Sequence, residues 1–178
     1  MSLLVLSWVV MLLTHEIGHL VGGWCGGATL VDVDLAPWRM PYSIHHPDPH
    51  PRLTLWAGPL LGVIVPVGTA ILVQGHKTRR QTKQQTQQPT RRQAWRKWAW
   101  LVADFCLLAN GTYLAIAWVA CDRFLDTPRM LAAGVSPIFI AAYCVVTVSV
   151  GYVRFRNDCV VFFSRRESSN SSEGSSIY

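Results

Sequence analysis

The sequence predicts an all-α polytopic membrane protein, with about four transmembrane helices and a short β-strand and loop insertion after the first helix. Hydrophobic residues make up 51% of the 178 residues, and charged residues only 15%. The apolar residues fall in long blocks, each long enough to cross a hydrocarbon layer about 30 Å thick. A further segment alternates apolar and acidic residues, as strands do. The four blocks cover residues 2–24, 53–73, 98–120 and 131–153.

The first block is expected to be a retained helix and not a signal peptide. Lys and Arg are absent from its N-terminal part, and no small-residue cleavage site follows a short apolar core. Four glycines then fall within the six residues from Gly22 to Gly27, where they permit a tight turn that a helix does not favour. The first helix is therefore expected to end in this run.

The residues after this turn predict a short strand. From Thr29 to Leu35 the chain alternates apolar and acidic side chains with a period of two. A strand near a bilayer must pair or be covered by protein, since lipid offers its amides no hydrogen bonds. Prolines at positions 37, 41, 47, 49 and 51 then predict an irregular, extended loop.

The net charge of +6 comes from one segment. Residues 76–97 contain eight Lys or Arg and no acid, so the rest of the chain carries a net charge of −2. Basic loops stay on the cytoplasmic side of a membrane, and the segment from Arg154 to Arg166 is basic too. We therefore expect a multi-pass protein of a bacterial-type inner membrane with both termini in the cytoplasm. Charge confined to a loop in this way does not indicate a nucleic-acid partner.

Two polar segments predict disorder. Residues 76–97 form a basic loop whose centre is rich in glutamine, and residues 164–178 form a serine-rich tail. Residues 1–163 are therefore expected to form one membrane-embedded domain. The five cysteines lack CxxC spacing, and their odd number excludes a complete disulfide framework, so we interpret most of them as small apolar side chains.

The segment His15-Glu16-Ile17-Gly18-His19 carries the strongest chemical signal. Two histidines four residues apart stand one turn apart on the same face of a helix, so they can share one metal ion, which we expect to be Zn²⁺. Glu16 lies beside them and is expected to act as a general base toward water rather than as a ligand. Random placement of the 6 histidines and the glutamates of this chain gives roughly 0.003 matches to the pattern.

The apolar setting of this motif strengthens the interpretation. Ionisable side chains within a membrane helix are costly and usually functional, and three of them within five residues need a shared partner. If the helix starts near the inner surface at Met1, His15 is roughly 20 Å along a path of about 30 Å. The alternative is that these three side chains are interfacial residues at a helix end, hydrogen-bonded to one another or to water.

A third metal ligand must come from another helix, because catalytic zinc sites commonly have three protein ligands. The candidates are Asp126, Asp122 and Asp104. Asp104 falls within the third apolar block, where a structural or a metal-binding role is open to it. The other two lie in a short polar connection and are alternatively solvated loop acids. The histidines at positions 45, 46 and 50 are a weaker candidate for a second metal site, since their proline-rich setting is typical of exposed loop histidines.

Three elements of the chain together resemble the site-2 protease family of intramembrane zinc metalloproteases. An apolar first helix with HExxH precedes a glycine-rich turn and a short strand, and Trp56-Ala57-Gly58-Pro59-Leu60-Leu61-Gly62 resembles the AGPL element that opens a core helix in that family. The segment Leu125-Asp126-Thr127-Pro128-Arg129-Met130-Leu131 keeps Leu, Asp, Arg and Leu of an LDGGRxL pattern, with Thr127 and Pro128 in place of its two glycines. The family's Asn-x-x-Pro-x-x-Pro run is missing, although Asn110-Gly111 begins a comparable stretch farther upstream.

This resemblance implies an intramembrane zinc metalloprotease in which His15, His19 and Asp126 bind Zn²⁺ and Glu16 is the catalytic base. The expected substrate is a membrane-spanning or juxtamembrane segment of another protein in the same lipid bilayer, held by edge pairing with the strand at 30–35. Two other classes stay open. One is a catalytically silent scaffold that retains the metal helix, and the other is a small ion-binding or transport protein that uses the same charges for transport.

Overall fold

The computed structural model describes residues 2–39, 41–75 and 91–174, which form mainly helices with one small sheet. The elements in these residues are α1 (Ser2–Cys25), β1 (Leu30–Asp34), β2 (Tyr42–His45), α2 (Pro51–Gly75), α3 (Arg91–Ala120), α4 (Asp126–Ala132) and α5 (Pro137–Gly174). Four helical segments are long and apolar enough to cross a membrane: Leu3–Cys25, Pro51–Gly75, Trp95–Ala120 and Pro137–Val160. The predicted fold class is confirmed, and the four helices fit a multi-pass integral membrane protein.

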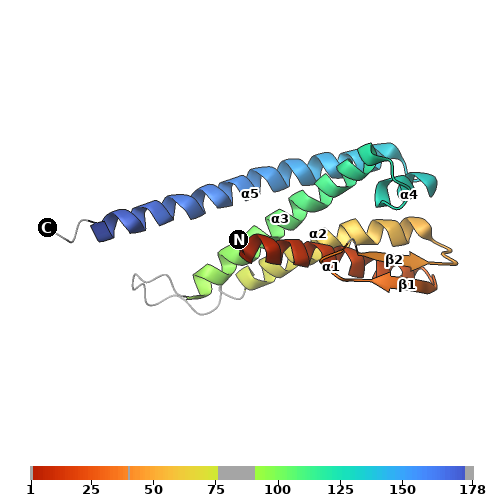
Figure 1. Ribbon diagram of the computed structural model, residues 1–178, viewed down its shortest axis with the longest axis horizontal. Coiled ribbons are helices and arrows are strands. Elements are labelled where there is room, and N and C mark those ends of the chain that lie inside the picture. Colours follow the sequence, from red (N-terminus) through yellow and green to blue (C-terminus); the bar gives the residue numbers. More distant parts are fainter. Residues whose placement is uncertain (1, 40, 76–90, 175–178) are drawn as a thin grey trace.

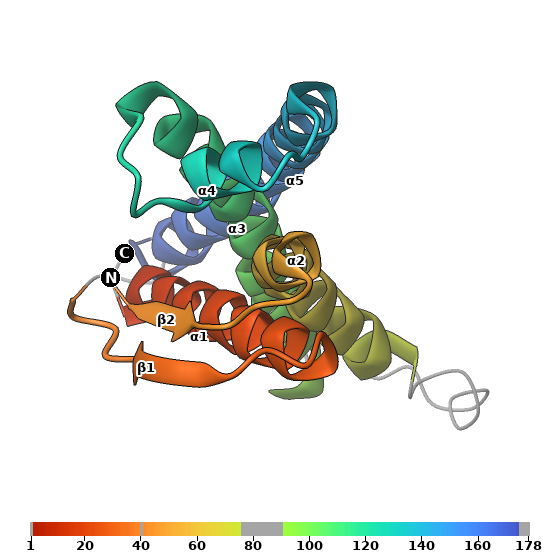
Figure 2. The same cartoon turned by 90° about the vertical axis from the view of Figure 1, so that its right-hand side faces the viewer.

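The long helices pack as two pairs. Helix α1 packs chiefly against α2, helix α3 packs chiefly against α5, and α3 joins the pairs through contacts with α1 and α2. The sheet and α4 lie at the same end of the bundle, on the right in Figure 1. Figure 2 looks onto this end and shows the two strands beside α1, with α4 next to α3 and α5. The end of α2 and the start of α3 lie toward the opposite end (Figure 1).

Glycines allow α1 and α2 to approach closely. A Cβ atom at Gly18 would collide with the carbonyl oxygen of Ala57 and the Cα of Gly58, and one at Gly22 would collide with the Ala57 side chain. Small residues at such spacing let the backbones of two membrane helices come into contact. The close approach brings the HExxH segment of α1 against the first turns of α2.

Three helix boundaries differ from the prediction by more than two residues. Helix α3 begins at Arg91 rather than at residue 98, so residues 91–97 of the predicted disordered loop are helical. Helix α5 begins at Pro137 rather than at 131, because Gly134, with a φ of +77°, separates it from α4. It continues to Gly174, into the predicted tail. Both extensions start from a stable membrane helix, where each added residue gains a hydrogen bond without a new nucleus. The other residues expected to be disordered, 76–90 and 175–178, lie outside the described residues.

The insertion after α1 is a two-stranded antiparallel hairpin. The predicted strand is confirmed as β1, but the prediction of an irregular loop throughout the proline-rich segment is wrong, because Tyr42–His45 forms β2. These four residues lie between prolines and contain none, so every amide is free to enter the ladder. Across the hairpin, the Tyr42 hydroxyl donates a hydrogen bond to Asp32 Oδ2 at 2.9 Å. Within the described residues the sheet has two strands, so each strand keeps one edge without a strand partner.

Candidate metal centre

The HExxH segment lies in the middle of α1. His15 and His19 are each 4% exposed and Glu16 is 8% exposed. At a rise of about 1.5 Å per residue, His15 is about 18 Å along the helix from Leu3 and about 15 Å from Cys25. The three ionisable side chains are therefore buried in protein at the centre of a candidate membrane span. The alternative placement of the motif at a helix end does not agree with this position.

Asp126, the first residue of α4, brings a carboxylate to the two histidines. Its Oδ2 is 2.8 Å from His15 Nε2 and 3.3 Å from His19 Nε2, and the two Nε2 atoms are 3.2 Å apart. Ligands bound to zinc at about 2.0–2.1 Å in a tetrahedron are about 3.3 Å from one another. The three atoms therefore form a triangle close to one face of a zinc tetrahedron, and the donor set of two imidazoles and a carboxylate fits Zn²⁺.

Hydrogen bonds on the far side of each imidazole orient these donors. His19 Nδ1 donates to the carbonyl oxygen of Thr54 at 2.9 Å. Because a carbonyl only accepts, the proton of a neutral His19 is on Nδ1 and the lone pair of Nε2 is free for a metal. His15 Nδ1 lies 2.8 Å from Asn110 Oδ1. Carbonyl or amide partners behind ligating histidines are typical of metal sites.

The amide of Asn110 can face His15 in only one way. Its Nδ2 donates to the carbonyl oxygens of Cys106 at 2.9 Å and Gly62 at 3.2 Å. Since these acceptors require the NH₂ group, Oδ1 must be the atom that faces His15, and it accepts the Nδ1 proton. Asn110 is fully buried, and it links α3 to both α1 and α2 at the depth of the histidines.

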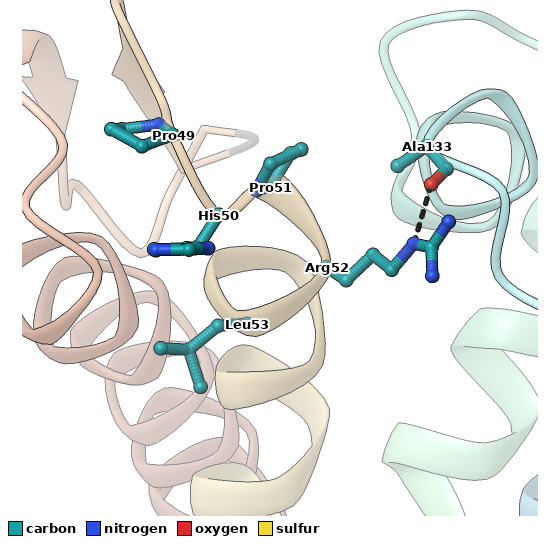
Figure 3. Close-up of a pocket in the computed structure, with 6 residues that line it drawn as sticks. All are labelled: Pro49, His50, Pro51, Arg52, Leu53 and Ala133. Carbon is teal, nitrogen blue, oxygen red and sulfur yellow. Dashed lines mark hydrogen bonds between the residues drawn. The ribbon is translucent and has the colours of Figure 1, made fainter.

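Helix α4 is held in place at both ends. Thr127, which is fully buried, donates from Oγ1 to the carbonyl oxygen of Leu114 on α3 at 2.8 Å. At the other end, Arg52 Nε donates to the carbonyl oxygen of Ala133 at 2.8 Å, a contact that Figure 3 shows reaching across from the start of α2. The shallow surface pocket around Arg52 is lined by residues outside the metal centre. Thr127 and Arg52 thus fix the position of the helix that carries Asp126.

Glu16 lies beside the donor atoms but is not part of their triangle. One of its carboxylate oxygens is within 4.8 Å of a ring nitrogen of each histidine. Its Oε2 atom is buried and has no hydrogen-bond partner in the protein. A buried carboxylate oxygen without a partner is costly, and such atoms concentrate at functional sites. The arrangement suits a base that acts on a bound molecule.

The other two aspartates considered from the sequence lie in different environments. Asp104 is 1% exposed and pairs with Arg154 at 2.7 Å, and the Arg154 guanidinium stacks over Trp100. Asp122 is exposed and accepts a hydrogen bond from the backbone of Phe124. Asp126 is thus the aspartate of the three that the structure brings to the histidines.

The loop histidines do not gather around a second centre. His46 and His50 are exposed, whereas His45 of β2 packs over Gly23, one turn beyond His19 on α1. Burial lowers the pKa of His45 below its usual value, which favours a neutral imidazole at pH 7. In the part of the chain that the structure describes, the groups of His, Asp and Glu close enough to share a metal all lie at this one centre, as the HExxH trio and as the two histidines with Asp126.

The surroundings of the histidines include residues that the sequence did not single out. Thr54 contributes a backbone carbonyl, which no side-chain pattern reports. Tyr113 lies edge-on against the ring of His15, with the centroids 5.4 Å apart. Asn110 carried a detectable signal, since a polar amide within an apolar block needs a partner.

Comparison of the chain with models of protein families, with curated proteins and with solved structures finds no match. Its function must therefore be inferred from the residues and their geometry.

Proposed function

We propose that this protein is an intramembrane zinc metalloprotease. The observation that carries the proposal is the convergence of His15 Nε2, His19 Nε2 and Asp126 Oδ2 at mutual distances of 2.8–3.3 Å, next to the buried carboxylate of Glu16. Two histidines, a carboxylate and an adjacent glutamate form a set that suits a hydrolytic zinc site. The resemblance to site-2 proteases points to the same ligands.

Each side chain has a distinct task in this proposal. His15, His19 and Asp126 hold the metal, which when bound polarises the scissile carbonyl and lowers the pKa of water. Glu16 takes a proton from the attacking water and passes it to the leaving amine. Asn110 and the carbonyl of Thr54 keep the imidazoles in the tautomer and orientation that binding needs.

The proposed substrate is a membrane-spanning or juxtamembrane segment of another membrane protein. An α-helix hides its amides in its own hydrogen bonds, so the segment must unwind locally before hydrolysis. The hairpin lies beside α1 (Figure 2) and has an edge to which an extended segment can add as a strand. Its apolar side chains at Leu30, Val31 and Val33 are exposed, which suits a partner drawn from lipid.

We propose a bacterial-type inner membrane as the location, with both termini in the cytoplasm. The support is the concentration of basic residues between α2 and α3, on the side where positive loops are retained. An even number of candidate spans, with the basic segment between the second and the third, supports an arrangement with both ends of the chain on the side of that segment.

Zinc content and cleavage, measured together in wild type and Glu16→Gln, test the proposal. Glutamine keeps the shape of the side chain but cannot accept the proton, so the variant is expected to retain stoichiometric zinc and lose cleavage. Wild-type protein without stoichiometric zinc would falsify the proposal. If wild type binds zinc but does not cleave, the result favours a catalytically silent scaffold. If Glu16→Gln cleaves as fast as wild type, Glu16 is not the catalytic base.

A further inference from the structure

Helix α3 presents two polar residues to the metal centre from one face. Asn110 contacts His15 Nδ1, and Tyr113, one turn later, lies against the ring of the same histidine. The two rings are 5.4 Å apart and nearly perpendicular, with an interplanar angle of 86°. This face of α3 therefore supplies both the partner behind His15 and an aromatic side chain beside it.

The Tyr113 phenol lies near other groups of the candidate centre. Its surroundings include the backbone of Asp126 at the start of α4 and, farther off, the charged groups of Glu16 and Arg129. Tyr113 is partly buried, whereas its helical neighbours Asn110 and Leu114 are fully buried. Its ring is thus at the edge of the candidate metal centre, in contact with the candidate ligand His15 and near the start of α4.

We propose that Tyr113 is a catalytic residue whose hydroxyl donates a hydrogen bond to the oxygen of the scissile carbonyl as that oxygen becomes negative. The inference rests on the proposed proteolytic function. When water adds to the carbonyl carbon, a C–O bond forms and the π-electron pair moves onto the carbonyl oxygen. Tyr113 stabilises this charge without giving up its proton. The C–N bond then breaks, and the amine leaves with the proton carried by Glu16.

A phenol suits this task at this depth. It is uncharged, so it can be buried beside an apolar bundle without the cost of an ion, and it becomes a stronger donor as the acceptor gains charge in a low-dielectric site. Removal of one such donor typically lowers kcat by about 10²- to 10³-fold. A purely structural tyrosine, in contrast, contributes through packing and ground-state hydrogen bonds.

The chain offers a matched control in Tyr143. This residue also lies within a membrane helix, packs edge-on against an aromatic ring, that of Trp56, at 5.6 Å, and is partly buried. Its hydroxyl donates to a backbone carbonyl oxygen of α2, that of Pro59, at 2.8 Å. Tyr→Phe removes the phenolic oxygen at each position. At Tyr113 this tests the proposed catalytic role, and at Tyr143 it removes a structural hydrogen bond.

The experiment compares purified full-length wild type, Tyr113→Phe and Tyr143→Phe. For each protein, zinc content, Tm, kcat and KM for a membrane peptide are measured, together with the Kd of a phosphinic peptide that mimics the tetrahedral oxyanion. Tyr113→Phe is expected to keep zinc, Tm and KM, to lose at least about 10²-fold in kcat, and to bind the phosphinic peptide at least about 10-fold more weakly. Tyr143→Phe is expected to lower Tm and leave kcat and the phosphinic peptide's Kd unchanged.

The possible outcomes distinguish a failure of the Tyr113 role from a failure of the proposed protease function. If wild type binds zinc and cleaves while Tyr113→Phe matches it in kcat and in affinity for the phosphinic peptide, the role of Tyr113 is overturned and the protease stands. If Tyr113→Phe loses zinc along with activity, Tyr113 is a packing residue for His15 and the inference is again wrong. Wild type without zinc or cleavage overturns the protease, and the inference with it.

Discussion

Asn110 is the uncharged side chain on which the geometry of the centre depends most. Its amide makes three hydrogen bonds, to Gly62, Cys106 and His15, and leaves no freedom to rotate. The close approach of Gly62, where a Cβ would collide with the amide, leaves no room for a larger neighbour. The orientation of the His15 ring on α1 therefore depends, through Asn110, on how α2 and α3 pack.

Replacement of Asn110 by alanine is expected to weaken zinc binding about 10- to 100-fold, the usual effect of losing a partner behind a ligating histidine. Thr112→Ala is the control, because Thr112 lies two residues away on α3 and its hydroxyl bonds only within its own helix, to the Leu108 carbonyl oxygen at 2.8 Å. Competition with a chromophoric chelator measures both affinities. Equal zinc affinity in the two variants would show that His15 needs no partner on α3.

The third ligand can be tested by the same measurement. Asp126→Ala is expected to lose stoichiometric zinc, because two imidazoles alone leave a catalytic zinc site one protein ligand short. Asp122→Ala, four residues earlier in the exposed connection, is expected to retain it. If Asp126→Ala retains zinc, Asp126 is not a zinc ligand.

The residues of the candidate metal centre that lie close together in the sequence were the easiest to predict. His15, Glu16 and His19 lie within one helical turn, so their spacing alone predicted a shared face. Asp126 was one of three aspartates, favoured over the others only through the resemblance to a family. The contributions of Thr54 and Tyr113 depend on how α2 and α3 pack against α1, and residue spacing carries no information about that packing.

At the scale of elements, the α1–α2 contact positions His19 against α2. The Thr54 carbonyl lies on α2 and orients the His19 ring, and Gly58 of the same helix faces that ring, where a Cβ atom would overlap it. The glycines at positions 18 and 22 keep the two backbones at contact distance. The metal centre is therefore sensitive to any side chain inserted between these helices.

Gly18→Ala is expected to destabilise the protein by about 1–3 kcal/mol and to weaken zinc binding, because the new methyl group meets backbone atoms of α2 that cannot move aside locally. Gly68→Ala on α2 is the control: its Cβ would meet nothing within 4 Å, and alanine favours a helix by roughly 0.5–1 kcal/mol over glycine. Tm and zinc affinity are expected to fall in the first variant only. If both variants keep the wild-type Tm, α1 and α2 are not in contact at Gly18.

Element length explains which parts of the fold could be predicted. The four membrane helices are long apolar blocks, and β1 alternates clearly, so both were recognised from local pattern. Helix α4 has 7 residues and β2 has 4, too few for a period to be visible, and the prolines around β2 are typical of loops. Strand β2 is stabilised by pairing with β1, which is a non-local interaction.

For the whole molecule, the arrangement places a charged centre where lipid cannot reach it. The two histidines lie on α1, in the α1–α2 pair. The amide that orients His15 lies on α3, in the α3–α5 pair. Helix α4 covers the junction and adds the carboxylate. Each pair by itself would leave ionisable groups facing hydrocarbon, so burial of these charges requires that both pairs assemble.

The proposed orientation of the molecule in the membrane rests on its charges and can be tested with reporter fusions. Alkaline phosphatase fused after Lys83 is expected to be inactive, because the positive-inside rule predicts that the basic segment is retained in the cytoplasm. The same enzyme fused after Asp48, beyond the hairpin and before α2, is expected to be active, since one membrane span separates the two positions. A fusion after Ser164 is the control for the C-terminal span and is expected to be inactive. Two active fusions at Asp48 and Lys83, or two inactive ones, would mean that α2 does not cross the membrane.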